Sequence, residues 1–439
     1  MNKKILQLAI PNIISNITIP LLGMVDLAIT GHLESSAYMG AIAIGSMVFN
    51  IIYWTFSFLR MGVTGLTAQA YGAKNNTEII NNLSRGLVVA IVGSLFLIIL
   101  QIPIERLVFS MVEGSSEVEK YAKEYFYIRI WAAPATISMY VVSGWFIGMQ
   151  NTKIPMIIAL LVNAFNIGFN LLFVNVFGMK SDGVALGTVI AQYLGVSVAI
   201  VFFMIKYKSY FQYFSIRKAI KREHLLNFFK VNKDIFIRTM SLLTVFTFFT
   251  SQSASTNDTV LAANTLLLQF LFIFSFLTDG FAYAAEALTG KYYGRKDIVK
   301  LKIAINLSFK WGAFVALFFT LIYLLGSTSL IKLLTNQQAV IDLSQNYKFW
   351  VILIPVASIV SFIWDGVFIG ITAAKQMRNS MLVAVFVVFF PVWFFLNGTY
   401  QNHALWLAFI LFLFTRGFAQ TIIYFKTINK KLLINNSGL

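Results

Sequence analysis

The sequence is dominated by long apolar runs that alternate with short polar segments over nearly its whole length. A helix of roughly 20 residues crosses the hydrocarbon core of a bilayer, and each run reaches that length. Leu and Phe fill these runs without strict alternation, so they predict helices and not the strands of a membrane β-barrel. The sequence predicts about twelve spans: 6–30, 38–60, 82–104, 122–148, 154–177, 184–206, 233–254, 259–288, 303–326, 346–370, 377–397 and 403–425.

The composition supports an integral membrane protein and argues against several other classes. Of the 439 residues, 58% are hydrophobic and 12% are charged, which is about half the charged fraction of a soluble domain. The chain has no Cys, and its three His lie far apart, so we expect no metal site. It contains no P-loop, H-E-x-x-H or G-x-S-x-G motif. We therefore expect no cofactor and no enzyme activity.

The basic residues predict the orientation in the membrane. Most of the 34 Lys and Arg lie in alternate loops that share a side with both termini, and eight of them fall within 206–233. Because basic loops stay in the cytoplasm, both termini are expected to be cytoplasmic in a multi-pass protein of the cell membrane. The net charge of +17 then reflects topology, and we expect no nucleic-acid partner.

Two segments of the first half recur in the second half at the same spacing. "LTAQAYGAKN" at 66–75 matches "LTGKYYGRKD" at 288–297, and "SGWFIGMQNTK" at 143–153 matches "DGVFIGITAAK" at 365–375. Repeats of this kind with an even number of spans are parallel copies. We therefore expect an all-α membrane protein of two homologous six-helix bundles with a central cleft. The expected parts are bundle 1–206, a basic cytoplasmic linker 207–232 and bundle 233–439.

Polar residues inside the spans are the candidate functional residues, because burying them in a bilayer is costly. In the first half, Asp26 provides a carboxylate. Asn163, Asn166 and Asn170 share one helix face, as do Thr188 and Gln192. A carboxylate with amide and hydroxyl neighbours can hold a proton or a cation. The alternative is that these groups only join helices by hydrogen bonds.

The second half has its own acidic group, and helix 1 contains two candidate hinges. The acidic residues are Asp279, Glu286 and Asp365, with Arg60 and Arg238 available as partners. They could serve coupling or gating, or they could form structural ion pairs. Asn50 and Tyr53 lie on a polar stripe and, with Asn163 and Gln192, are candidates for lining the cleft. Pro11 and Pro20 interrupt the first span and could permit it to bend.

Six segments in order along the chain resemble the multidrug and toxic compound extrusion family, specifically its DinF-like branch. They are "MVDLAITGHL", "FLRMGVTGLTAQAYG", "IRIWAAPAT", "NKDIFIRTMSLLTVFTFFTSQSA", "DGFAYAAEALTG" and "WDGVFIGITAAKQMRNSM". The resemblance implies twelve helices in two bundles and efflux driven by a proton or sodium gradient.

The resemblance also implies roles for individual residues. Asp26 matches the acidic residue that the family uses for cation coupling, and Asn166 and Thr188 match its polar partners. Asn170 departs from the pattern, because some relatives have an acidic residue there. With one carboxylate fewer, proton coupling is favoured over Na⁺ coupling. Asp365 falls in the region where other branches place a sodium ligand.

These observations predict a secondary antiporter that works by alternating access between the two bundles and exports small organic compounds. H⁺ or Na⁺ is the coupling ion, and one chain suffices because it contains both bundles. Two alternatives remain. One is a flippase for a lipid-linked precursor, which would need a basic cleft for phosphates. The other is a membrane enzyme or scaffold, which would require neither the repeat nor the intramembrane carboxylates.

Overall fold

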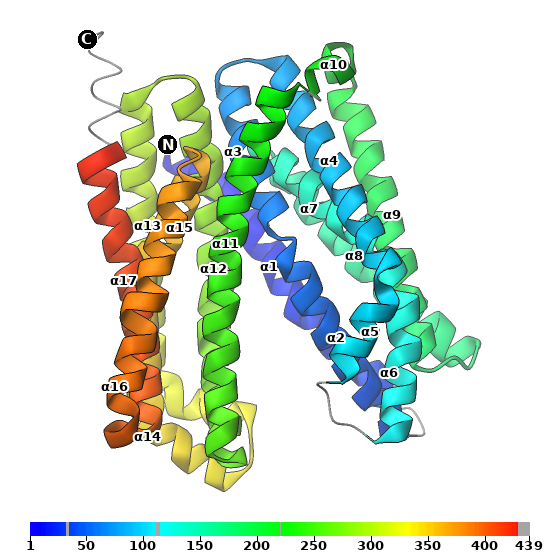
Figure 1. Ribbon diagram of the computed structural model, residues 1–439, viewed down its shortest axis with the longest axis vertical. Coiled ribbons are helices and arrows are strands. Elements are labelled where there is room, and N and C mark those ends of the chain that lie inside the picture. Colours follow the sequence, from blue (N-terminus) through cyan, green and yellow to red (C-terminus); the bar gives the residue numbers. More distant parts are fainter. Residues whose placement is uncertain (32–34, 111–114, 220, 429–439) are drawn as a thin grey trace. The chain divides into compact units, whose positions relative to one another are not determined.

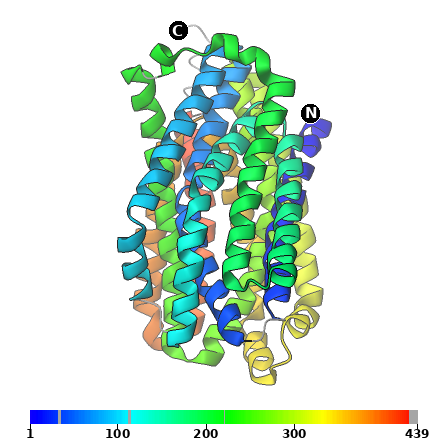
Figure 2. The same cartoon turned by 90° about the vertical axis from the view of Figure 1, so that its right-hand side faces the viewer.

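The computed structural model describes residues 1–31, 35–110, 115–219 and 221–428, and nearly all of them are helical (Figures 1 and 2). Within this part of the chain, ten helical segments are long and apolar enough to cross a membrane. Two further long helices are α1 (Asn2–Thr30) and α11 (Arg222–Thr256). The expected all-α membrane fold of about twelve helices is thus confirmed.

The chain forms two compact units, which we call the first bundle (Ile14–Phe228) and the second bundle (Met1–Ile13 with Phe229–Leu439). The division falls inside α1 and inside α11. The beginning of α1 packs within the second bundle, where Ala9 is fully buried and its carbonyl lies close to Gly280. Each bundle therefore contains a helical segment that continues into the other.

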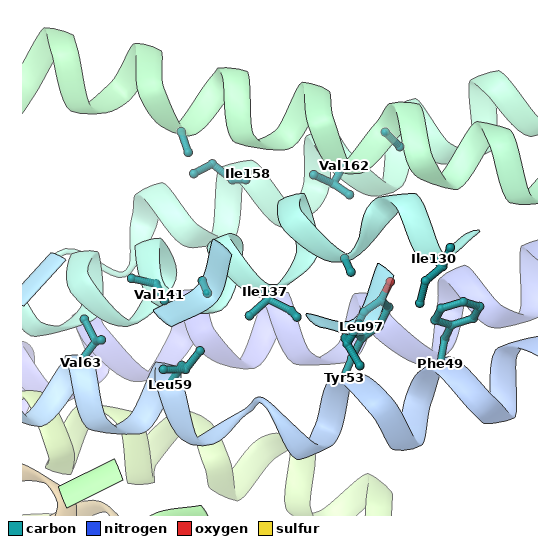
Figure 3. Close-up of a cluster of buried hydrophobic side chains, with 14 of the residues drawn as sticks. Phe49, Tyr53, Leu59, Val63, Leu97, Ile130, Ile137, Val141, Ile158 and Val162 are labelled. Carbon is teal, nitrogen blue, oxygen red and sulfur yellow. The ribbon is translucent and has the colours of Figure 1, made fainter. Parts of the chain in front are cut away.

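In its described residues, the first bundle contains the rest of α1, the start of α11 and nine other α-helices. They are α2 (Ser36–Thr55), α3 (Phe58–Gly72), α4 (Asn76–Ile99), α5 (Gln101–Phe109), α6 (Ser116–Arg129), α7 (Ala133–Gly148), α8 (Lys153–Leu171), α9 (Ser181–Tyr207) and α10 (Ile216–Ala219). Its apolar core includes the side chains labelled in Figure 3, among them Phe49, Tyr53 and Ile137.

Up to residue 428, the second bundle contains the start of α1, most of α11 and six other α-helices. They are α12 (Asp258–Gly294), α13 (Ile298–Leu334), α14 (Gln338–Gly370), α15 (Ala374–Val383), α16 (Phe390–Tyr400) and α17 (Asn402–Ile423). Many large apolar side chains on both bundles are exposed, such as Ile205 in the first bundle and Leu325 in the second. A bilayer would cover such surfaces.

The sequence repeat is also a structural repeat. Lys74 and Lys296 have φ values of 56° and 58°, and Gln150 and Thr372 have 63° and 53°. Each pair is separated by the same 222 residues that separate the repeated segments. These left-handed residues end helices in the same way in both halves. The two bundles are therefore homologous, as expected.

The residue after the first of these turns caps the next helix in both halves. The side chain of Asn75 accepts from the Glu78 N–H at the start of α4, and that of Asp297 accepts from the Lys300 N–H at the start of α13. The backbone N–H and the ammonium group of Lys300 together hold the pKa of the Asp297 carboxyl below its ordinary value. The same cap is neutral in one half and charged in the other.

Two glycines in each half bring helices together. A Cβ on Gly144 would lie 2.4 Å from the Arg60 carbonyl oxygen, and one on Gly366 would lie 2.2 Å from the Ala282 carbonyl oxygen. Four residues further on, a Cβ on Gly148 would lie 2.9 Å from the Thr64 carbonyl oxygen of α3, and one on Gly370 would lie 2.5 Å from the Glu286 carbonyl oxygen of α12. Small residues at this spacing let membrane helices approach backbone to backbone. They pack α7 on α3 and α14 on α12.

The two bundles differ in how continuous their helices are. In the first bundle, helices break between α2 and α3, between α4 and α5, and between α6 and α7. The corresponding helices of the second bundle, α12, α13 and α14, run without interruption. The break after α6 places Arg129 at a helix C-terminus, where a cation is favoured by the helix dipole.

Candidate functional site

The first bundle contains a buried network of amide and hydroxyl groups on α8 and α9. Asn170 Nδ2 donates to Asn166 Oδ1 over 3.0 Å, and Asn166 Nδ2 donates to Thr188 Oγ1 over 2.8 Å. Thr188 Oγ1 donates in turn to the Val184 carbonyl oxygen. All three side chains are at most 4% exposed. The structure thus brings together three residues that the sequence singled out, and we call them the amide centre.

A guanidinium lies at the edge of the amide centre. Arg129 Nη1 lies 3.5 Å from Thr188 Oγ1 and donates to the Tyr125 hydroxyl. The Arg129 guanidinium also lies over the Phe49 ring, 5.6 Å from its centroid. Ser46 Oγ on α2 lies 3.4 Å from the Tyr125 hydroxyl. These contacts connect α2, α6 and α9 through polar groups.

Helix α8 also contacts α1. Asn163 Nδ2 donates to the Thr18 carbonyl oxygen over 3.3 Å, so the predicted asparagine face is turned toward the helix that contains Asp26. The side chains of Asp26 and Pro20 lie outside the described residues. Their backbone belongs to α1, which is helical through both Pro11 and Pro20.

The other candidates for lining a cleft lie in different surroundings within the first bundle. Asn50 is exposed on α2. Tyr53 is 7% exposed and packs against Phe49 in the apolar core. Gln192 is half-buried on α9, one turn after Thr188. The role of these residues in a cleft stays a prediction.

The second bundle contains a buried ionic centre around Asp365 of α14. Its Oδ2 accepts from the guanidiniums of Arg238 on α11 and Arg416 on α17, the latter over 2.7 Å. Its Oδ1 accepts from Gln420 Nε2, also over 2.7 Å. All four residues are at most 7% exposed. The structure thus gives Asp365 two basic partners, one of which the sequence had proposed.

The two remaining acidic candidates lie on α12. Asp279 interacts electrostatically with Arg416, so a second carboxylate contributes to the charge balance around the ionic centre. Glu286 is 1% exposed and lies where α12 meets Gly370 of α14. Arg60, the other basic residue considered, is buried in α3 of the first bundle. One turn before Arg238, Asp234 pairs with Arg378 of α15 at 2.6 Å.

Sequence reasoning missed three members of these centres: Arg129, Arg416 and Gln420. Their signal was present, because Arg129 and Arg416 are charged residues within apolar runs, and Gln420 follows Arg416 by one helical turn. Such residues usually face a bundle interior and have polar partners. The sequence could not show that Arg416 and Gln420 bind Asp365, because α14 and α17 are separated by two other helices along the chain.

The MatE family model matches two separate segments of the chain, residues 11–172 and 235–395. The chain belongs to the MatE family. The two matched segments lie in the two halves of the sequence repeat. DNA damage-inducible protein F of Escherichia coli K12 is 35% identical over 96% of this chain and 92% of its own length. A probable multidrug resistance protein NorM of Photorhabdus laumondii is 24% identical over 90% of this chain and 88% of its own length.

Solved MATE structures share the fold of this MatE protein. A crystal structure of MATE in the bent conformation has a TM-score of 0.88 at 18% identity. The match covers 99% of this chain and 97% of the chain in that crystal structure. A Vibrio cholerae MATE transporter, VcmN, has a TM-score of 0.85 at 18% identity, with 98% and 97% covered. Membership of the family makes the chain a multi-pass membrane transporter and not an enzyme.

Gly187 positions the amide centre of this MatE protein, since a Cβ there would lie 2.2 Å from Asn170 Oδ1. We expect Gly187→Ala to displace the Asn170 amide and to lower transport at least severalfold. The bundle should stay folded, because the nearest atom belongs to a side chain, which can move aside more easily than backbone. Gly168→Ala on α8, where nothing lies within 4 Å, is the control. Efflux from proteoliposomes measures both, and equal rates would contradict the prediction.

Proposed function

We propose that this MatE family member exports small organic compounds in exchange for protons, by alternating access between its two bundles. The amide centre of Asn166, Asn170 and Thr188 carries this proposal, because it is a buried polar site on α8 and α9, and α8 bonds to α1. Asn163 bonds to the α1 backbone from the same helix as Asn166 and Asn170. We place the exchangeable proton on Asp26 and assign the three residues to the same site.

The contrast with the second bundle supports Asp26 as the proton carrier. Asp365 accepts hydrogen bonds from two guanidiniums and an amide. Its protonation would leave two buried cations with less counter-charge, which costs free energy. A carboxylate in that position is suited to holding helices together. Asp279 and Glu286 are assigned to the same second-bundle role, with Asp279 sharing the charge of Arg416.

The composition of the amide centre favours a proton over Na⁺. Asn170 provides an amide where the family resemblance implies a carboxylate in some relatives, so the site has one negative charge fewer. Na⁺ is a hard cation that needs several oxygen ligands together, whereas a proton needs only one carboxylate oxygen. We therefore propose an exchange of H⁺ for substrate.

The proposed substrates are small organic compounds that are drug-like and often cationic or amphipathic. The name of the NorM relative describes that protein as a probable multidrug resistance protein. Asn50, Tyr53, Asn163 and Gln192 are the proposed lining residues of the first bundle. Substrate and proton would compete for this bundle, so that proton entry from outside favours release.

The proposed hinge is the part of α1 between Pro11 and Pro20. The division between the bundles falls after Ile13, between these two residues. Proline removes a backbone hydrogen bond and permits a helix to bend. We further propose a location in the cytoplasmic membrane with both termini inside, and function as a monomer.

The test is efflux of a fluorescent organic cation from proteoliposomes under an imposed ΔpH and, separately, under a Na⁺ gradient. Wild type, Asp26→Asn and Asp365→Asn are compared, with the folded fraction of each measured beforehand. We expect ΔpH alone to drive efflux in wild type, and Asp26→Asn to lose it while remaining folded. Efflux that needs Na⁺, or that survives Asp26→Asn, would contradict the proposal.

A further inference from the structure

The chain between α9 and α11 is a basic segment without acidic residues. Residues 206–222 contain six Lys or Arg and no Asp or Glu. Lys206 lies in the last turn of α9, Lys208 begins the short helix η3 (Lys208–Tyr213), and Arg217 and Lys218 lie on α10. All four residues are exposed, and among the described residues none of them has a carboxylate partner. We call these four residues the linker cations.

The linker cations begin where the apolar surface of α9 ends. The last exposed residues of α9 before Lys206 are Ile200, Val201, Met204 and Ile205. The hydrocarbon of a bilayer would cover such a surface, and α9 with η3 is long and apolar enough to cross one. Lys206 therefore marks the level at which the chain passes from the hydrocarbon to the headgroup layer.

The first bundle holds the basic segment in place. Tyr210 of η3 packs edge-on against Trp145 of α7, with 6.3 Å between the ring centroids. Arg85 Nη2 of α4 donates to the Lys218 carbonyl oxygen over 3.2 Å, and α10 lies beside α4 (Figure 1). The side chains of the linker cations stay exposed while these contacts fix the segment. A charged surface that is already ordered loses little entropy when it binds a partner.

Exposed aromatic side chains lie among the linker cations. Phe211, Tyr213 and Phe214 are 48%, 39% and 41% exposed. Aromatic rings are favoured at the headgroup level of a bilayer, where apolar and polar surroundings meet. A soluble anionic partner would match the cations alone. An anionic bilayer matches the cations, the aromatic rings and the apolar end of α9 together.

We infer that the linker cations form a binding surface for the phosphate groups of anionic lipids in the membrane around the protein. The inference is independent of the substrate and of the coupling ion. Each basic residue near an anionic membrane surface raises the affinity about fivefold. Four of them should therefore favour an anionic over a zwitterionic lipid on the order of a hundredfold. Because the cations are exposed, salt should weaken this preference steeply.

The test titrates phosphatidylglycerol or phosphatidylcholine into the whole chain purified in detergent. The melting temperature and the lipid retained in native mass spectrometry are measured at low salt and at about 0.5 M NaCl. In wild type at low salt, we expect phosphatidylglycerol to be retained preferentially and to raise the melting temperature more than phosphatidylcholine does. The high salt concentration should remove most of this difference. Glycerol phosphate, which has the headgroup charge without the acyl chains, should have no effect.

Two quadruple variants separate the linker cations from the net charge of the protein. The first carries Lys206→Gln, Lys208→Gln, Arg217→Gln and Lys218→Gln, and it should lose the preference for phosphatidylglycerol. The matched control replaces four exposed cations outside the segment and should keep the preference at the same net charge. Its substitutions are Arg106→Gln, Lys153→Gln, Lys332→Gln and Lys375→Gln.

Several outcomes would overturn the inference. They are a wild type that does not distinguish the two lipids, a preference that survives removal of the linker cations, and an equal loss in both quadruple variants. An effect of glycerol phosphate as large as that of phosphatidylglycerol would indicate a site for a small soluble anion instead. The salt series on wild type decides the question even if the first variant does not fold. Since none of these measurements uses transport, a negative result leaves the proposed function standing.

Discussion

Replacing Asp365 with Ala is expected to destabilise the second bundle by about 3–5 kcal/mol, the usual cost of removing one partner from a buried ion pair. Two guanidiniums and an amide donate to this carboxylate. Its loss leaves Arg238 and Arg416 buried beside each other with less counter-charge. Thermal unfolding in detergent, followed by the loss of folded monodisperse protein, measures the effect.

Two further variants separate the charge from the packing at this centre. The triple variant Asp365→Leu, Arg238→Met and Arg416→Met removes all three charges, and we expect it to recover most of the lost stability, since apolar replacements of buried ion pairs are often neutral. Asp342→Ala, an exposed position on the same helix, is the control. A loss in Asp365→Ala no larger than in Asp342→Ala would show that the ionic centre does not stabilise the bundle.

Gly366→Ala is expected to have the second large effect. The added Cβ would lie 2.2 Å from the Ala282 carbonyl oxygen, and a backbone atom cannot rotate away as a side chain can. Helices α12 and α14 would have to separate, at a cost of about 3 kcal/mol or more, the upper end of overpacking in cores. The yield of folded protein and its melting temperature measure the change.

The repeat provides a matched pair for this experiment. Gly144→Ala in the first bundle meets the Arg60 carbonyl oxygen at 2.4 Å and should have a similar effect there. Gly326→Ala in α13 meets nothing within 4 Å and should be neutral or slightly stabilising. If Gly366→Ala is as stable as Gly326→Ala, the close approach of α12 and α14 is not needed for folding.

Much of the fold could be predicted from the sequence because it follows from local patterns. Apolar runs of sufficient length predicted the spans, and two matched strings predicted the repeat that the backbone at Lys74 and Lys296 reproduces. The face shared by Asn166 and Asn170 followed from helical periodicity. These two residues are four apart, so one turn of a regular helix brings their side chains within hydrogen-bonding distance.

The remainder depends on contacts between distant parts of the chain. Gln420 was not predicted because its partner Asp365 lies on a different helix. The breaks in the first bundle were not predicted either, and proline alone does not explain them. Pro103 and Pro134 follow two of the breaks. The break between α2 and α3 has no proline, and Pro355 lies inside the continuous helix α14. Tertiary packing decides between these outcomes.

The division of α1 between the bundles has a consequence for the order in which the protein can fold. The residues before Ile14 are synthesised ahead of the first bundle, yet they pack with the bundle that follows it along the chain. Asn2 accepts from Trp311, and Ala9 and Ile13 lie against Gly280. The second bundle can therefore complete its packing only with a segment that was synthesised long before the rest of that bundle. Contacts over such sequence separations make a late folding step slow.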